Sequence, residues 1–145
     1  MFTVEIGRLH HVKFIYEQLI VQRKILFYSY DEFIDSYNLF ISNPNNKVYV
    51  LIDDQSKKNA GCIVAQVNNE LSKKSRLIEI KDFIILAKHR KNKGAEFLYE
   101  FFENEMNREQ VYNIKVECDI NSTLNQNFYT SKGFKIYKKS YLKSC

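Results

Sequence analysis

A single basic turn, residues 88–94, carries the residue types with the clearest chemical meaning. The residues before it alternate as in a β-strand, and those after it are apolar at helical spacing, so the turn leads into a helix. The first N–H groups of a helix have no intrahelical partner, and the macrodipole places partial positive charge there. The pattern predicts a site for a phosphate-bearing ligand, with a solvated charged face as the alternative. Five basic side chains strengthen the field: Lys88, His89, Arg90, Lys91 and Lys93.

A second informative segment, residues 116–134, begins as a strand and continues as a short helix. Residues 116–120 alternate as a strand does, and either Asn121 or Ser122 is suited to cap a helix. Gly133 is suited to end that helix.

Together the two segments resemble the GNAT superfamily of acyl-CoA-dependent N-acetyltransferases. The pyrophosphate motif of that family is Gln/Arg-x-x-Gly-x-Gly/Ala, which the turn fits at Arg90 and Ala95. Lys93 stands where the first glycine is usual, and Gly94 follows one place late. A later family motif, Asn-x-x-Ala-x-x-x-x-Tyr-x-x-x-Gly-Phe, has Leu124 in place of its alanine and otherwise fits at Asn121, Tyr129, Gly133 and Phe134. The resemblance covers nearly the whole chain.

The resemblance implies acetyl-CoA as the acyl-donor cosubstrate. Backbone N–H groups of the turn would hold its pyrophosphate, and Asn121 would hydrogen-bond its pantetheine arm. A splayed strand would aim a backbone N–H at the thioester oxygen, as in an oxyanion hole. The implied cofactor-binding residues are Phe83, Ile84, Ile85, Arg90, Lys91, Asn92, Lys93, Gly94, Ala95 and Asn121.

The implied chemistry is direct attack of a primary amine on the acetyl thioester. In the family motif the hydroxyl of the tyrosine matched by Tyr129 donates a proton to the departing thiolate. The alternative interpretation of Tyr129 is a helix tyrosine that packs on the sheet.

A general base is also expected, because a lysine-like amine with a pKa near 10.4 costs about 4 to 5 kcal/mol to deprotonate at pH 7. Histone acetyltransferases of this superfamily carry their catalytic glutamate at the position of Glu79. Strand parity places Glu79, Lys81, Phe83 and Ile85 on one face and Asp82 on the other, unless a bulge intervenes. Glu79 is therefore the first choice and Asp82 the second, with an ordinary solvated strand residue as the alternative for Glu79. Lys81 stands where spermidine acetyltransferases have a glutamate.

The acceptor is less determined by the sequence than the cofactor. In this fold the loop between the first two helices lies over the acceptor, and here it holds aromatic and acidic residues that are able to surround a cation. Equally, the aromatic residues belong to the core and the acids to a capping turn. The residues concerned are Phe27, Tyr28, Tyr30, Asp31, Glu32, Phe33 and Asp35. A small amine, a polyamine, a peptide N-terminus and a protein lysine all remain open.

Length and composition indicate one domain, residues 1–145, with a single sizeable core. Cys62, Cys118 and Cys145 form no CxxC pair and no histidine lies at ligand spacing, so neither a disulfide framework nor a metal site is indicated. No apolar run approaches ~20 residues, which disfavours membrane insertion and favours the cytoplasm.

The net charge of +5 is compatible with a nucleic-acid partner. Basic residues are nevertheless spread along the chain, and no common nucleic-acid-binding signature is present. Three hypotheses thus compete: an N-acetyltransferase, an acyl-CoA-binding sensor or scaffold without catalysis, and a basic nucleic-acid-binding module. Tyr129 separates the first two, because a sensor needs no acid for a leaving group.

The periodicities predict an α/β fold in the order β-α-α-β-β-β-α-β-α-β, a GNAT-like mixed, mostly antiparallel sheet with helices on both faces. Asp31 is expected to cap the second helix. The last strand is expected at 134–141, where family members commonly have two strands. The edge is then either simply shorter or covered by a second protomer in a homodimer. The other expected strands are 2–6, 48–53, 62–67, 78–86 and 112–120.

Overall fold

The computed structural model describes residues 1–23, 29–69, 76–119 and 121–144. Within them the strands form one sheet in chain order, β1-β2-β3-β4-β5. The pairings from β1 to β4 are antiparallel and the β4–β5 pairing is parallel, which confirms the predicted mixed, mostly antiparallel sheet. The strands are β1 Phe2–Ile6, β2 Asn46–Asp53, β3 Asn59–Asn68, β4 Leu77–Ile85 and β5 Asn113–Val116.

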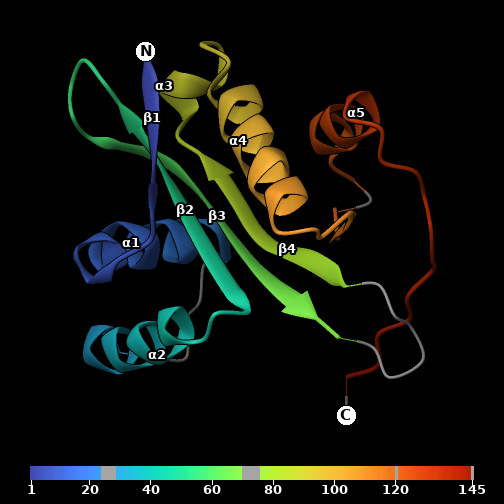
Figure 1. Ribbon diagram of the computed structural model, residues 1–145, viewed down its shortest axis with the longest axis horizontal. Helices are drawn as coiled ribbons and strands as arrows, with labels where there is room; N and C mark the ends of the chain where they lie inside the picture. Colours follow the sequence, from blue (N-terminus) through green and yellow to red (C-terminus); the bar gives the residue numbers. More distant parts are fainter. Residues whose placement is uncertain (24–28, 70–75, 120, 145) are drawn as a thin grey trace.

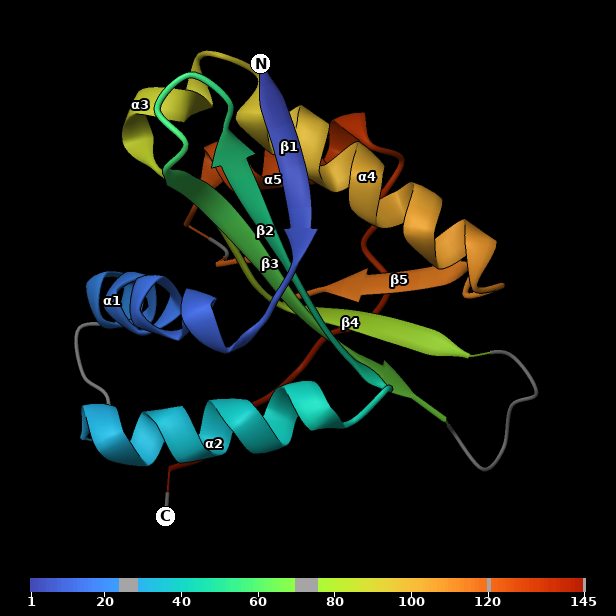
Figure 2. The same ribbon diagram turned by 60° about the vertical axis from the view of Figure 1, so that its left-hand side comes forward.

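Helices cover both faces of this sheet, as predicted (Figures 1 and 2). Two helices, α1 and α2, lie on one face, and α4 and α5 lie on the other. No helix of the described ranges combines the length and the apolar character that a membrane crossing requires. The helices are η1 Leu9–His11, α1 Val12–Arg23, α2 Tyr30–Ser42, α3 Ala87–Arg90, α4 Gly94–Arg108 and α5 Thr123–Ser131.

The central strands are apolar on both faces because each face supports its own core. Val48 and Val50 of β2 pack toward α1 and α2, whereas Tyr49 and Leu51, which alternate with them, pack toward α4. This alternation follows from the period of two in a strand. The sheet is thereby packed between two helical layers.

The start of α2 differs from the predicted one. Ser29, two residues before the expected cap Asp31, occupies the N-cap position, and its hydroxyl accepts a hydrogen bond from the N–H of Glu32 at 3.2 Å. The Glu32 carboxylate accepts in turn from the Ser29 N–H at 3.4 Å, which completes a capping box. Asp31 instead lies in the first turn, where a carboxylate favours the helix dipole.

A bulge in β4 overturns the strand parity predicted for the candidate bases. Asp82 pairs with Val64 of β3, but the next β3 residue, Ala65, pairs with Ile80, so Lys81 is an extra residue in β4. An extra residue reverses the side-chain alternation beyond it. Glu79 and Asp82 therefore share the α1/α2 face of the sheet, and Glu79 does not share a face with Phe83 and Ile85 as predicted.

The predicted last strand is absent, since residues 134–144 contain neither strand nor helix. The strand before α5 is also shorter than predicted, ending at Val116. Within the described residues β4 is the only strand paired with β5. A strand needs a neighbour for its backbone hydrogen bonds, so an apolar alternation such as that of residues 134–142 does not form one alone. Ile136, Tyr141 and Leu142 are accordingly exposed.

Candidate active site

The candidate site is a gap between β4 and β5. The two strands pair only from Leu77 opposite Asn113 to Ile80 opposite Val116, and β4 then continues to Ile85 beside β3 alone. A cavity of about 140 Å³ lies where they separate. It is lined by Gln22, Ile80, Lys81, Asp82, Phe83, Ile84, Val116, Glu117, Cys118, Asp119, Asn125 and Tyr129.

Tyr129 reaches this cavity from α5, on the α4 side of the sheet. Its ring makes an edge contact with Phe83 of β4 at 6.5 Å between centroids, and another with Phe134 at 5.4 Å. Burial, reinforced by the nearby Cys118, raises the pKa of Tyr129 to about 12. The hydroxyl is therefore protonated at neutral pH, the state that a proton donor requires.

Asp82 lines the same cavity from the opposite face. It shares this side with Ile84 of β4, and Gln22 from the end of α1 joins them at the cavity wall. Because Tyr129 approaches from the α4 side, the cavity brings together groups from both faces of the sheet.

Glu79, the first-choice base, is engaged elsewhere. Its side chain is 10% exposed, and its carboxylate pairs with the ammonium groups of Lys81 and Lys115, the latter at 3.0 Å. The hydrogen bond from Lys81, together with that from Lys115, lowers the pKa of Glu79. Glu79 is not among the residues that line the cavity.

The predicted phosphate turn contains a short helix, α3, and then a backbone of unusual conformation. Lys93, at the family's first glycine position, has φ 62° in the left-handed region. A side chain in that conformation costs roughly 1 to 2 kcal/mol, whereas glycine adopts it freely. Gly94 next to it is tightly packed, because an added Cβ would lie 3.0 Å from the carbonyl oxygen of His89.

Four of the five basic side chains of the turn are exposed, as an anion site requires. His89 is the exception: it is 6% exposed, its ring packs on the edge of Phe2 at 5.7 Å, and its Nδ1 has no hydrogen-bond partner among the described residues. Arg90 ties the turn to the strand, since its Nε donates to the carbonyl oxygen of Ile85 at 3.2 Å. Among the residues that the structure describes, no side chain caps the start of α4.

The structure places Asn121 at the entry to α5, outside the residues that line the cavity. Its N–H donates to the Asp119 carboxylate at 2.8 Å, and Ser122 occupies the N-cap position. Asn125 lines the cavity instead and was missed in the sequence. Its spacing of four residues before Tyr129 puts both on one helix face, which is the signal that identifies it.

The described part of the predicted acceptor segment serves helix packing. Tyr30 and Phe33 of α2 contact the ring of Tyr16 on α1 at 5.0 and 5.1 Å. Phe27 and Tyr28 lie outside the described residues. The interpretation as core aromatics and a capping turn thus holds for the described residues of this segment.

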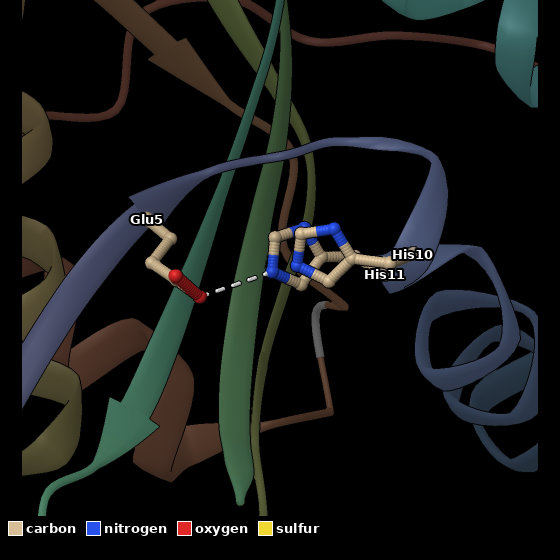
Figure 3. A group of neighbouring side chains, drawn as sticks. All are labelled: Glu5, His10 and His11. Carbon is tan, nitrogen blue, oxygen red and sulfur yellow. Dashed lines mark hydrogen bonds and ion pairs between the residues drawn. The ribbon is translucent and has the colours of Figure 1, made fainter. Parts of the chain in front are cut away.

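Glu5, His10 and His11 form a second polar cluster, at the junction of β1 and η1 (Figure 3). The Nδ1 of His11 accepts a hydrogen bond from the Arg8 N–H at 2.9 Å, so its proton is on Nε2, which faces the Glu5 carboxylate at 3.3 Å. A neutral imidazole has one lone pair. In His11 that lone pair accepts the hydrogen bond from the Arg8 N–H. The hydrogen bonds of His11 therefore connect η1 to β1, and its ring does not offer a free lone pair to a metal ion.

Comparison with known proteins agrees with this geometry. The family model of the Acetyltransferase (GNAT) family matches residues 13–134. No curated protein sequence matches the chain significantly.

Solved structures show the same fold at low sequence identity. Glucosamine-6-phosphate N-acetyltransferase from Arabidopsis thaliana is 16% identical, with 99% of this chain and 98% of that chain covered and a TM-score of 0.81. An aminoglycoside acetyltransferase from an uncultured soil metagenomic sample is 13% identical, with 99% and 96% covered and a TM-score of 0.83. A transcriptional regulator from Bacillus halodurans C-125 is 14% identical, with 100% of both chains covered and a TM-score of 0.87. With the family model matched over most of its length, the chain belongs to the GNAT family of acetyltransferases.

Proposed function

We propose that the protein transfers an acetyl group from acetyl-CoA to a primary amine by direct attack, with Tyr129 as the general acid. The observation that carries the proposal is the cavity between β4 and β5, which is lined by Tyr129 from one side of the sheet and by Asp82 from the other. A sensor that only binds acyl-CoA has no need of an acid and a carboxylate at one cavity.

The cofactor would bind along the α4 side. Backbone N–H groups of Arg90–Ala95 and the exposed lysines of the turn would hold its pyrophosphate. The pantetheine arm would enter the gap beside α5, within reach of Asn121 or Asn125. A backbone N–H of residues 83–85 would polarise the thioester oxygen as an oxyanion-hole donor does.

The amine would enter from the α1/α2 side. The protonated amine first loses one proton to Asp82, directly or through a water, because an ammonium nitrogen has no lone pair with which to attack. The neutral nitrogen then forms a bond to the thioester carbon, the carbon–sulfur bond breaks, and the departing thiolate takes the proton of Tyr129. The second proton of the nitrogen passes through solvent to the Tyr129 phenolate, and Asp82 releases its proton to solvent.

The geometry favours Asp82 over Glu79 as this base. Asp82 lines the cavity, whereas the carboxylate of Glu79 is held by two ammonium groups outside it. A base must come within hydrogen-bond reach of the proton it removes, and this criterion precedes its pKa.

The acceptor class is an amine. Two structural neighbours are named as a glucosamine-6-phosphate N-acetyltransferase and an aminoglycoside acetyltransferase, and both names refer to amine-bearing sugars. At this protein's cavity Asp82, Glu117 and Asp119 favour a cationic acceptor over an anionic one.

The test is release of free thiol from acetyl-CoA across a panel of amines, together with a thermal-shift assay for acetyl-CoA alone. We expect thiol release with at least one amine and a raised Tm, since a ligand at a hundredfold excess over its Kd stabilises by about 2.7 kcal/mol. Lys91→Glu places a carboxylate in the turn and is expected to remove the shift. Lys13→Glu makes the same charge change at an exposed position of α1, on the other face, and is expected to keep it.

Two results would contradict the proposal. A Tm shift without thiol release for any amine favours the sensor. A shift that survives in Lys91→Glu means that the turn does not hold the pyrophosphate.

A further inference from the structure

We propose that Glu79 is a positioning residue that fixes, through Lys115, the point at which β4 and β5 separate. This inference rests on the proposed function, because the gap that opens at that point is the proposed site of acetyl transfer. It gives Glu79 a role other than proton transfer.

The first observation is one of register. Glu79 lies directly opposite Lys115 in the parallel pairing of β4 and β5, one residue before the last pair, Ile80 and Val116. The cavity begins at that last pair, since both of its residues line the wall. The ion pair between Glu79 and Lys115 therefore links β4 to β5 directly before the two strands separate.

The second observation is the burial and charge of the group. The Glu79 side chain is 10% exposed, and its Oε2 lies 3.0 Å from Lys115 Nζ. Lys115 Nζ also lies 3.8 Å from Oε1 of Glu117, a residue of the cavity wall. The carboxylate is the buried member of this group, because the side chains of Lys115 and Lys81 are 33% and 41% exposed. Separation of β4 from β5 would leave that carboxylate with Lys81 alone, so the arrangement in which both lysines pair with Glu79 is preferred.

The third observation connects the same carboxylate to the bulge. Lys81 is the extra residue of β4, and its ammonium group pairs with Oε1 of Glu79. The bulge is what turns Asp82 to the α1/α2 face. The Glu79 carboxylate thus contacts two features of the site. Through Lys115 it holds β5 where the strands separate, and through Lys81 it holds the bulge that orients Asp82.

Apart from this ion pair, the pairing of β4 with β5 is short, since it extends over only four residue pairs among the described residues. The wall formed by Val116, Glu117 and Asp119 follows directly from β5, so a shift of that strand moves the wall relative to the thioester. A misplacement of about 1 Å costs up to a hundredfold in rate. Loss of the ion pair is therefore expected to affect catalysis without removing a reacting group.

The experiment compares the single variants Glu79→Gln and Lys115→Gln with their double variant. For each single variant we expect kcat/KM for acetyl transfer to fall by about ten- to a hundredfold. We expect the double variant to be no worse than either single variant.

The pH profile separates positioning from proton transfer. We expect the acidic limb of kcat/KM to keep its pKa in Glu79→Gln and Lys115→Gln, and to disappear in Asp82→Asn. Lys47→Gln is the matched control, because it breaks a lysine ion pair of 2.8 Å with Glu109 at the far end of α4. That variant is expected to retain kcat/KM within a few fold. Circular dichroism confirms that each variant is folded.

Several outcomes would overturn the inference. If Glu79→Gln removes the acidic limb while Lys115→Gln is unaffected, Glu79 is the base. If folded variants lose Tm but keep kcat and KM, the pair is structural only. An active wild type with unaffected variants contradicts the positioning role alone, whereas an inactive wild type contradicts the proposed function and this role with it.

Discussion

At the scale of single residues, the surroundings of Tyr129 decide what it is able to do. Aromatic edges of Phe83, Phe128 and Phe134 hold its ring, while its hydroxyl is polar and the cavity is beside it. Replacing the hydroxyl by hydrogen preserves those ring contacts. Substitution by phenylalanine therefore removes the proton donor without disturbing the packing of α5.

We expect Tyr129→Phe to lower kcat by roughly ten- to a thousandfold and to leave the affinity for acetyl-CoA within a few fold, because only the proton donor is lost. Steady-state kinetics and calorimetric titration measure the two quantities. Tyr112→Phe, at an exposed tyrosine outside the cavity, is the control. An unchanged kcat in Tyr129→Phe would assign protonation of the thiolate to another group or to water.

At the scale of elements, the turn between β4 and α4 has to meet two requirements that conflict at Lys93. The backbone conformation there favours glycine, whereas binding of an anion favours a positively charged side chain. The backbone at Lys93 requires the left-handed conformation, in which a lysine is strained, yet the lysine adds charge at the start of α4. Lys57 in the turn between β2 and β3 has nearly the same φ, 59° against 62°, and is exposed. The two positions are therefore matched in backbone conformation and charge, and only Lys93 belongs to the phosphate turn.

We expect Lys93→Gly to raise the free energy of unfolding by up to about 1 kcal/mol, because relief of the strain exceeds the added flexibility of the unfolded chain. The same variant is expected to weaken acetyl-CoA binding, through loss of the ammonium group. Lys57→Gly should give the same gain in urea unfolding without a change in acetyl-CoA affinity. Equal acetyl-CoA affinities in Lys93→Gly and wild type would exclude a contact between Lys93 and the phosphates.

At the scale of the whole molecule, the sheet separates two apolar cores, and the gap between β4 and β5 is where the two sides meet. The α1/α2 layer is joined to β1 through η1, whose His11 is 1% exposed. Its ring accepts from the Arg8 backbone and donates to Glu5. Protonation of this buried ring disrupts the junction, because the nitrogen that accepts the Arg8 N–H would become a donor.

Stability is therefore expected to depend on pH. Burial lowers the pKa of His11 below its ordinary 6.5 and outweighs the opposing hydrogen bond to Glu5. The unfolded chain then binds a proton more readily than the folded one, so the contribution of neutral His11 is complete above pH 6.5 and is lost as pH falls through the folded pKa. The difference between the urea unfolding midpoints at pH 7.5 and pH 5.5 measures this loss of stability. The drop should be larger in wild type than in His11→Gln, and equal drops would refute the role of His11.

Local patterns in the sequence were sufficient for most elements and for the family. The alternation of residues 2–6 predicted β1 with its observed bounds, and the basic turn before α4 was recognised from a change of period alone. The motif around Tyr129 also predicted a short helix ending near Gly133, which the structure confirms. These features depend on neighbours within a few residues, which is why one chain read by itself contains them.

Only the tertiary structure decided which carboxylate reaches the cavity and where the sheet ends. The bulge at Lys81 is a property of the register between β4 and β3, so parity counted along β4 alone assigned Glu79 to the wrong face. The ion pair between Glu79 and Lys115 depends on β5, in which Lys115 lies 36 residues later in the chain. The missing strand at 134–141 has the same cause: pairing belongs to two segments, and an alternating pattern specifies only one of them.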